Sequence, residues 1–109
     1  MTFNDYQTET NKTAIYPDRG HNFVYPVLGM MGESGEVAEK IKKVWRDKNN
    51  VISDIDKLEI KKEMGDVLWY LSQLATELQI DFDDVANTNV LKIQSRLERN
   101  KLNGDGDNR

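Results

Sequence analysis

The sequence of 109 residues contains no cysteine, a single histidine and only two prolines. Without cysteine, disulfides and thiolate zinc sites are excluded, and a reducing compartment is the natural setting. Both prolines, Pro17 and Pro26, lie in the first quarter, so this helix breaker is missing from everything that follows. No apolar run approaches the roughly 20 residues needed to span a membrane, and the amino terminus lacks the pattern of a secretory signal. We therefore expect a cytoplasmic protein with no membrane partner.

An excess of positive charge is also missing, since the formal net charge is −4. Proteins that bind nucleic acids usually carry a basic balance, so we expect no nucleic-acid partner. A chain of this length forms one domain, which we place over residues 1–109, with a core at about 22–101 and a polar tail at 102–109. Such a small domain buries only roughly 60–65% of its unfolded surface, so self-association is a natural way to stabilise it.

The hydrophobic pattern predicts four helices and gives little sign of strands. The helices are expected at about Asn4–Ala14, Asn22–Asp47, Lys57–Leu78 and Asp81–Lys101. The third gives the strongest signal, because its apolar residues recur at three- and four-residue steps in one dense stripe. In the fourth, Asp81 is expected to cap the first turn, and four apolar residues are expected to point inward: Val85, Val90, Ile93 and Leu97. We therefore predict an all-α fold, a four-helix bundle completed by oligomerisation.

Two pairs of acidic residues share the same spacing. Glu33 and Glu36 lie in the second predicted helix, and Glu63 and Asp66 lie in the third. Residues three apart project from the same side of a helix, so antiparallel neighbours would bring the two pairs face to face. Two unit charges about 5 Å apart repel by roughly 3 kcal/mol at an effective dielectric of 20. A magnesium ion, which prefers oxygen ligands, would remove this repulsion, and Mn²⁺ can take its place.

Other metals fit this pattern less well, and a solvated acidic face is the simpler interpretation. Calcium is disfavoured because no loop is dense in ligands, and zinc because His21, the one histidine, precedes the helix. Acid pairs also occur on solvated helix faces. However, Gly29, Gly32 and Gly35 surround the first pair, and each costs a helix about 1 kcal/mol relative to alanine. The presence of three glycines at this cost indicates that open space beside the acids matters more than local helix stability, which favours a binding site.

The two acidic segments resemble a known family. Gly32–Glu39 (GESGEVAE) and Glu63–Leu71 (EMGDVLWYL) are similar to the acidic helices of MazG-like pyrophosphohydrolases, in the all-α NTP pyrophosphohydrolase superfamily. The resemblance covers about residues 27–99. It implies a homodimer or homotetramer that depends on Mg²⁺ and cleaves nucleoside triphosphates to monophosphate and pyrophosphate. It also implies that all four acids are metal ligands. Gly32 stands where many relatives carry another Glu.

Catalytic roles follow from the proposed chemistry. A carboxylate that is not fully engaged by metal can take the proton of an attacking water. Glu33 and Glu36 are the candidates for this role, and Glu33 is favoured.

Trp69 is expected to point away from the acidic line and to contribute packing.

Five residues are candidates for substrate contacts. Lys43 shares the acidic face of its helix and is a candidate phosphate ligand, and Tyr70 follows Asp66 by one turn and could stack on a base. On the last helix, three polar residues at helical spacing resemble a family segment that contacts phosphate or nucleoside: Asn89, Lys92 and Arg96.

Two alternative functions remain open from the sequence. The chain could be a non-catalytic helical interaction module whose acids are solvated. It could also be a nucleotide hydrolase like the helical dUTPases, which use related acidic helices and release diphosphate. Metal binding separates the first alternative from the main hypothesis, and substrate profiling separates the second.

Overall fold

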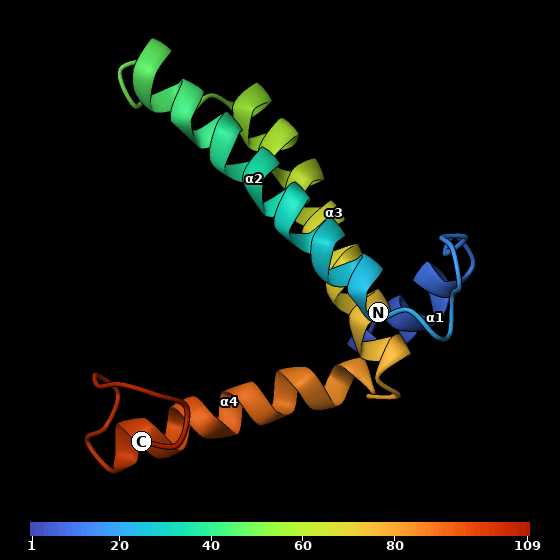
Figure 1. Ribbon diagram of the computed structural model, residues 1–109. Coiled ribbons are helices and arrows are strands. Elements are labelled where there is room, and N and C mark those ends of the chain that lie inside the picture. Colours follow the sequence, from blue (N-terminus) through green and yellow to red (C-terminus); the bar gives the residue numbers. More distant parts are fainter.

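The computed structural model describes residues 1–109 and consists of four helices and their connections (Figure 1). The helices are α1 (Phe3–Asn11), α2 (Val24–Asp47), α3 (Asp54–Glu77) and α4 (Phe82–Glu98). Their number and order confirm the all-α prediction. None of these helices combines the length and the apolar character that crossing a membrane requires.

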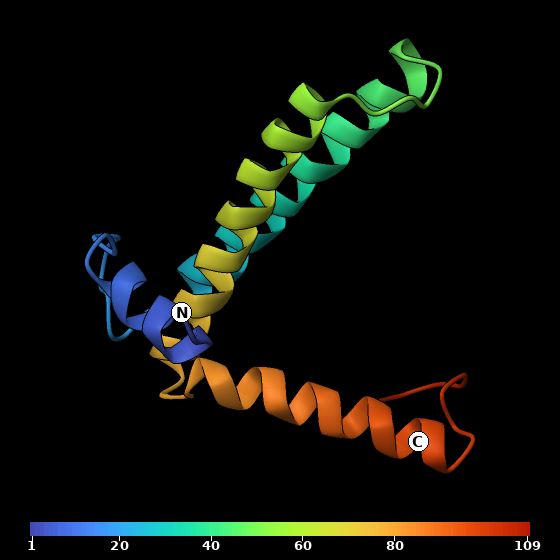
Figure 2. The ribbon, with the colours of Figure 1, turned by 180° about the vertical axis from the view of Figure 1, so that it is seen from behind.

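The two longest helices, α2 and α3, form an antiparallel hairpin and lie side by side in both views (Figures 1 and 2). Pro26 lies in the first turn of α2, where a missing amide hydrogen removes no intrahelical hydrogen bond. Asn49 and Asn50 turn the chain with φ angles of 51° and 59°, a left-handed conformation that asparagine tolerates. This hairpin is the scaffold that positions the acidic residues.

The structure starts α3 at Asp54, three residues before the predicted Lys57. The reason is a capping box. The Ser53 hydroxyl accepts from the Asp56 amide at 3.1 Å, and the Asp56 carboxylate accepts from the Ser53 amide at 3.0 Å. These two bonds satisfy amides that a helix start leaves unpaired, so the helix extends back to this point.

The short helix α1 packs on the carboxyl-terminal half of α3 and ends at Asn11, three residues before the predicted Ala14. Its polar side chains hold it there. The Gln7 amide donates to Thr76 Oγ1 at 3.1 Å, and the hydroxyls of Thr10 and Ser72 are 3.0 Å apart. This contact places the turn after α1 beside the middle of α3.

Helix α4 leaves the hairpin and extends away from it, as both views show (Figures 1 and 2). It contacts only α1 and α3. The four apolar residues predicted to point inward are exposed by between 39% and 65%: Val85, Val90, Ile93 and Leu97. That prediction is wrong for the single chain, because no other helix packs along this part of α4, and the tail that follows it contacts Lys92 and Arg96 through Asp107 instead.

The start of α4 is held by α1 rather than by its own cap. Asp81 stands at the predicted capping position, but its side chain makes no capping hydrogen bond. Instead, the Phe82 amide donates to the Gln7 side chain at 3.0 Å, and the Asp83 amide donates to the Asn4 side chain at 2.9 Å. The predicted cap is therefore replaced by two side chains from another helix, which sequence position alone could not indicate.

Candidate metal centre

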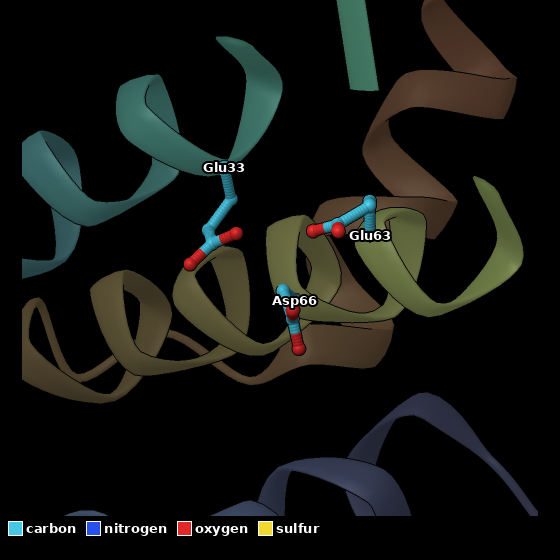
Figure 3. A group of neighbouring side chains, drawn as sticks. All are labelled: Glu33, Glu63 and Asp66. Atoms are coloured by element: carbon cyan, nitrogen blue, oxygen red, sulfur yellow. The ribbon is translucent and has the colours of Figure 1, made fainter. Parts of the chain in front are cut away.

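Three carboxylates from the two helices of the hairpin converge. Oxygen atoms of Glu33, Glu63 and Asp66 all lie within 4.8 Å of one another. Figure 3 shows Glu33 extending from α2 toward α3, which carries the other two residues. The convergence follows from local structure, since residues three apart share one side of a helix and the antiparallel hairpin turns the two acidic sides together.

Glu36 does not join this group in the structure. It lies one turn after Glu33 on α2, and its side chain is exposed. The structure thus brings together three of the four acids that the sequence singled out. Glu36 still acts on the cluster through its charge, because it is one of the groups that raise the pKa of Glu33.

The charges of the cluster are poorly compensated. Partial burial raises the pKa of Glu33, and the neighbouring carboxylates of Asp66, Glu63 and Glu36 raise it further. The one ion pair of the three acids is long, with 3.7 Å between Lys40 Nζ and Glu63 Oε1. A set of clustered carboxylate oxygens with little compensating positive charge is the ligand type that hard divalent cations such as Mg²⁺ prefer. The donor set therefore fits a magnesium ion.

A pocket of about 340 Å³ adjoins the acids and is lined by Thr13, Glu33, Asp66, Trp69 and Tyr70. Trp69 was expected to point away from the acidic line, and the structure corrects this. Its indole Nε1 donates to Thr13 Oγ1 at 3.0 Å, which holds the ring at the pocket. Helical phase could not reveal this, because the contact depends on the turn after α1.

Tyr70 packs directly on α2. A Cβ atom added at Gly29 would overlap the Tyr70 ring, whereas Cβ atoms at Gly32 and Gly35 would meet no atom within 4 Å. The glycines near the acids therefore differ in role. Gly29 provides the room that Tyr70 occupies, while the other two leave open space.

Comparisons with known proteins identify the family of this chain. The family model of the MazG nucleotide pyrophosphohydrolase domain matches residues 26–100. The chain belongs to this family. The MazG domain is also 41% identical over 109 residues to the Gene 37 protein of Mycobacterium phage L5, an alignment that covers 95% of this chain and 96% of the phage protein. No solved structure matches the chain significantly.

The remaining candidate substrate residues of the MazG domain lie away from the acids in this chain. Lys43 pairs with Glu39 at 3.7 Å and lines a separate cavity of about 280 Å³. Asn89 is exposed on α4. Lys92 Nζ and the Arg96 guanidinium lie 3.1 Å and 3.3 Å from the Asp107 carboxylate. Because α4 diverges from the hairpin, Asn89, Lys92 and Arg96 are not part of the pocket within one chain.

Glu77 is a structural anchor that the sequence analysis did not single out. Its carboxylate accepts from the Tyr16 hydroxyl at 2.6 Å and from the amides of Gly20 and Asn22 at 2.9 Å and 3.4 Å. Burial acts to raise the pKa of Glu77, but these hydrogen bonds outweigh it and leave the pKa below its ordinary value. Tyr16 also stacks on Tyr25, with ring centroids 4.9 Å apart. The signal available in the sequence was position, since Glu77 shares its side of α3 with Asp66.

Proposed function

We propose that this MazG domain catalyses the Mg²⁺-dependent hydrolysis of ribo- or deoxyribonucleoside triphosphates to nucleoside monophosphate and pyrophosphate. The observation that carries the proposal is the convergence of Glu33, Glu63 and Asp66 within 4.8 Å. The adjoining pocket, with its two aromatic side chains, supports a nucleotide as the ligand. Membership of a family of nucleotide pyrophosphohydrolases supports a phosphoanhydride bond as the point of cleavage.

Glu33, Glu63 and Asp66 would hold the metal ion, which is Mg²⁺ or, in its place, Mn²⁺. Glu36 would complete the set, because its exposed side chain on the next turn of α2 is free to rotate toward the cluster. A bound ion would offset the negative charge of the phosphates and acidify a water molecule beside them.

Glu33 is our candidate for the general base. It faces the two acids of α3 from the opposite helix, so one of its oxygens can accept the proton of the attacking water. Glu36 is the second candidate. Either residue would hold that proton on a carboxylate oxygen and return it to solvent after the bond is broken.

The pocket residues would orient the nucleotide. Trp69 and Tyr70 offer aromatic faces, and base–aromatic stacking contributes about 1–3 kcal/mol per base in proteins that bind single-stranded nucleic acids. Lys40 lies 3.7 Å from Glu63 of the acidic cluster, so it joins Lys43 as a candidate phosphate ligand. These contacts would exclude water from one side of the phosphates and fix their position.

Assembly into a homodimer or homotetramer is part of the same proposal. The exposed apolar residues of α4 need a cover, and so does a cavity of about 340 Å³ lined by Ser34, Val37, Met64, Val67, Leu68 and Leu71. Burial of such surface is favourable by about 25 cal/mol per Å². In an assembly, Asn89, Lys92 and Arg96 would serve a site formed with another copy.

A pyrophosphate-release assay across ribo- and deoxyribonucleoside triphosphates tests the proposed reaction. We expect monophosphate and pyrophosphate with Mg²⁺ and no products in chelator. Asp66→Asn and Glu63→Gln should abolish turnover while the helical circular dichroism persists. Glu59→Gln is the matched control, because Glu59 lies on the same helix and pairs with Lys62 at 3.2 Å.

The substrate profile and metal binding also separate the alternatives. Turnover confined to dUTP among the triphosphates would favour the dUTPase-like hydrolase. Absence of Mg²⁺ binding and of any product would favour a helical interaction module.

A further inference from the structure

One buried polar side chain has no hydrogen-bond partner in the protein. Gln73 is completely buried, yet neither its Nε2 nor its Oε1 has a hydrogen-bond partner. Leaving a buried polar atom unpaired costs about 1–3 kcal/mol. The adjacent Ser72 is equally buried, but its hydroxyl pairs with Thr10 at 3.0 Å. The fold therefore satisfies polar groups in this region, and the Gln73 amide is an exception that stability does not explain.

Gln73 lies on the same line of α3 as the acidic site. At about 100° per residue, seven residues bring the chain back to within roughly 20° of the direction of Asp66. At about 1.5 Å per residue, Gln73 is about 10 Å further along the helix. The ribose and base of a nucleotide can bridge a span of this length. A nucleotide with its phosphates at Asp66 could thus place its base at Gln73.

The two flanks of this line are formed by other elements. On one flank, Ser72 meets Thr10 of α1 and Trp69 meets Thr13 of the following turn. On the other flank, Tyr70 packs on Gly29 of α2. Gln73 lies between these flanks by helical phase, in line with the pocket that Trp69 and Tyr70 border.

The connection between α1 and α2 lies over this end of α3. Tyr16 and Gly20, both in that connection, hydrogen-bond to Glu77, which is one turn beyond Gln73. Ala14 and Tyr16 are buried, at 6% and 8% exposure. Gln73 is completely buried and does not line the pocket in this structure, so contact between its amide and a base requires this connection to move.

We propose that Gln73 is a specificity-determining residue that reads the nucleobase. Its carboxamide offers a donor and an acceptor side by side, which is the arrangement needed to pair with one edge of a base. Stacking on aromatic rings accepts any base, because every base has a π face. The amide would supply the discrimination that stacking lacks. This inference rests on the proposed function, because it assigns the base subsite of the same pocket.

The test is Gln73→Met, which keeps the length of the side chain and removes both polar atoms. Pyrophosphate release is measured for triphosphates that differ only in the base. We expect kcat/KM for the preferred substrate to fall about 10–100-fold, the effect of losing one or two hydrogen bonds. The other substrates should change about threefold or less. The thermal midpoint of the free protein should stay the same or rise. Gln94→Met, the same substitution at an exposed position of α4, should change neither quantity.

Three results would overturn the inference while leaving the proposed function intact. The wild-type protein could hydrolyse all bases equally, or Gln73→Met could keep the wild-type preference. The variant could also slow every substrate equally and lower the thermal midpoint, as expected if the amide only holds a structural water.

Failure of the proposed function gives a different result, namely no pyrophosphate release from any substrate by the wild-type protein. Recognition of the base is then tested by measuring the affinity of the protein for each of five nucleosides: adenosine, guanosine, cytidine, uridine and thymidine. A preferred nucleoside whose binding is lost in Gln73→Met would support the inference. The inference would be overturned if none of the nucleosides bound, or if Gln73→Met bound them with the same affinities as the wild-type protein.

Discussion

The ring of Tyr70 lies so close to the backbone of Gly29 that a single added Cβ atom would overlap it. The contact joins the two helices that carry the acidic residues, one turn from Glu33 on α2 and one turn from Asp66 on α3. Tyr70 also borders the pocket. The packing of the hairpin and the shape of the site are therefore set at the same point.

Gly29→Ala should destabilise the protein through this contact. Overpacking lowers the free energy of unfolding by about 1–3 kcal/mol. The higher helix propensity of alanine raises it by about 1 kcal/mol. We expect a net loss of about 1 kcal/mol in the free energy of unfolding, measured with urea, together with lower activity because Tyr70 must move. Gly35→Ala is the control, since open space surrounds Gly35, and it should stabilise by about 1 kcal/mol. Equal stabilisation by both substitutions would contradict the assigned role of Gly29.

Metal binding should appear as a change in stability. An ion that binds only the folded state at 100 times its Kd stabilises that state by about 2.7 kcal/mol. Addition of Mg²⁺ should therefore raise the thermal midpoint of the wild-type protein, and a chelator should reverse the effect. Asp66→Asn should show no response to Mg²⁺. Its midpoint without metal should equal or exceed that of the wild-type protein, because one of the clustered charges is gone. A full Mg²⁺ response in this variant would remove Asp66 from the site.

Gly32→Glu should be tolerated, although it adds a charge beside the acids. A Cβ atom at Gly32 meets nothing within 4 Å, and replacing glycine in a helix interior gains about 1 kcal/mol. Repulsion from Glu36, four residues later, costs only about 0.2–0.5 kcal/mol. Urea unfolding should thus show a small net stabilisation. A loss of stability would mean that Gly32 has a packing role that the structure does not show.

Glu77 should make the connection between α1 and α2 sensitive to acid. Its pKa is lowered in the folded protein from an ordinary value of 4.5, so its contribution to stability is present above that pH. The contribution is lost as the pH falls below 4.5 and the folded carboxylate takes up a proton. The difference in unfolding free energy between the wild-type protein and Glu77→Gln should therefore be largest at neutral pH and should shrink in acid.

Proteolysis gives a local readout of the same anchor. Arg19 is exposed within the connection that Glu77 holds. Loss of one hydrogen bond to a charged group costs about 1.5 kcal/mol, so trypsin should cut at Arg19 about 10-fold faster in Glu77→Gln. Glu9→Gln, on exposed α1 surface, should leave the cleavage rate unchanged. Equal rates in all three proteins would show that the connection does not depend on Glu77.

Assembly can be tested on α4. Val90 and Leu97 are 52% and 65% exposed in the single chain. If another copy covers them, replacing both with glutamate should shift sedimentation from an oligomer to a monomer and lower the thermal midpoint. The control replaces Thr88 and Gln94, which are exposed polar residues of the same helix. A wild-type protein that sediments as a monomer at micromolar concentration would rule out the proposed assembly.

Local patterns accounted for much of what the sequence analysis predicted. The four helices follow from the spacing of apolar residues, which depends only on the geometry of a single helix. The pairing of Glu63 with Asp66 on one side of α3 follows from the same geometry. The start of α3 was missed because a capping box is decided by two side-chain hydrogen bonds, and the cap of α4 was misassigned because α1 supplies it.

The sequence by itself therefore determined the helical class, the family and the acids that can meet, since each depends on neighbours along the chain. Only the tertiary structure decided that Glu33 joins Glu63 and Asp66 while Glu36 stays outside, and that α4 leaves the hairpin. It also decided that Trp69 turns toward the pocket. These outcomes depend on contacts between residues far apart in the chain, and the periodicity of one helix carries no information about what lies against it.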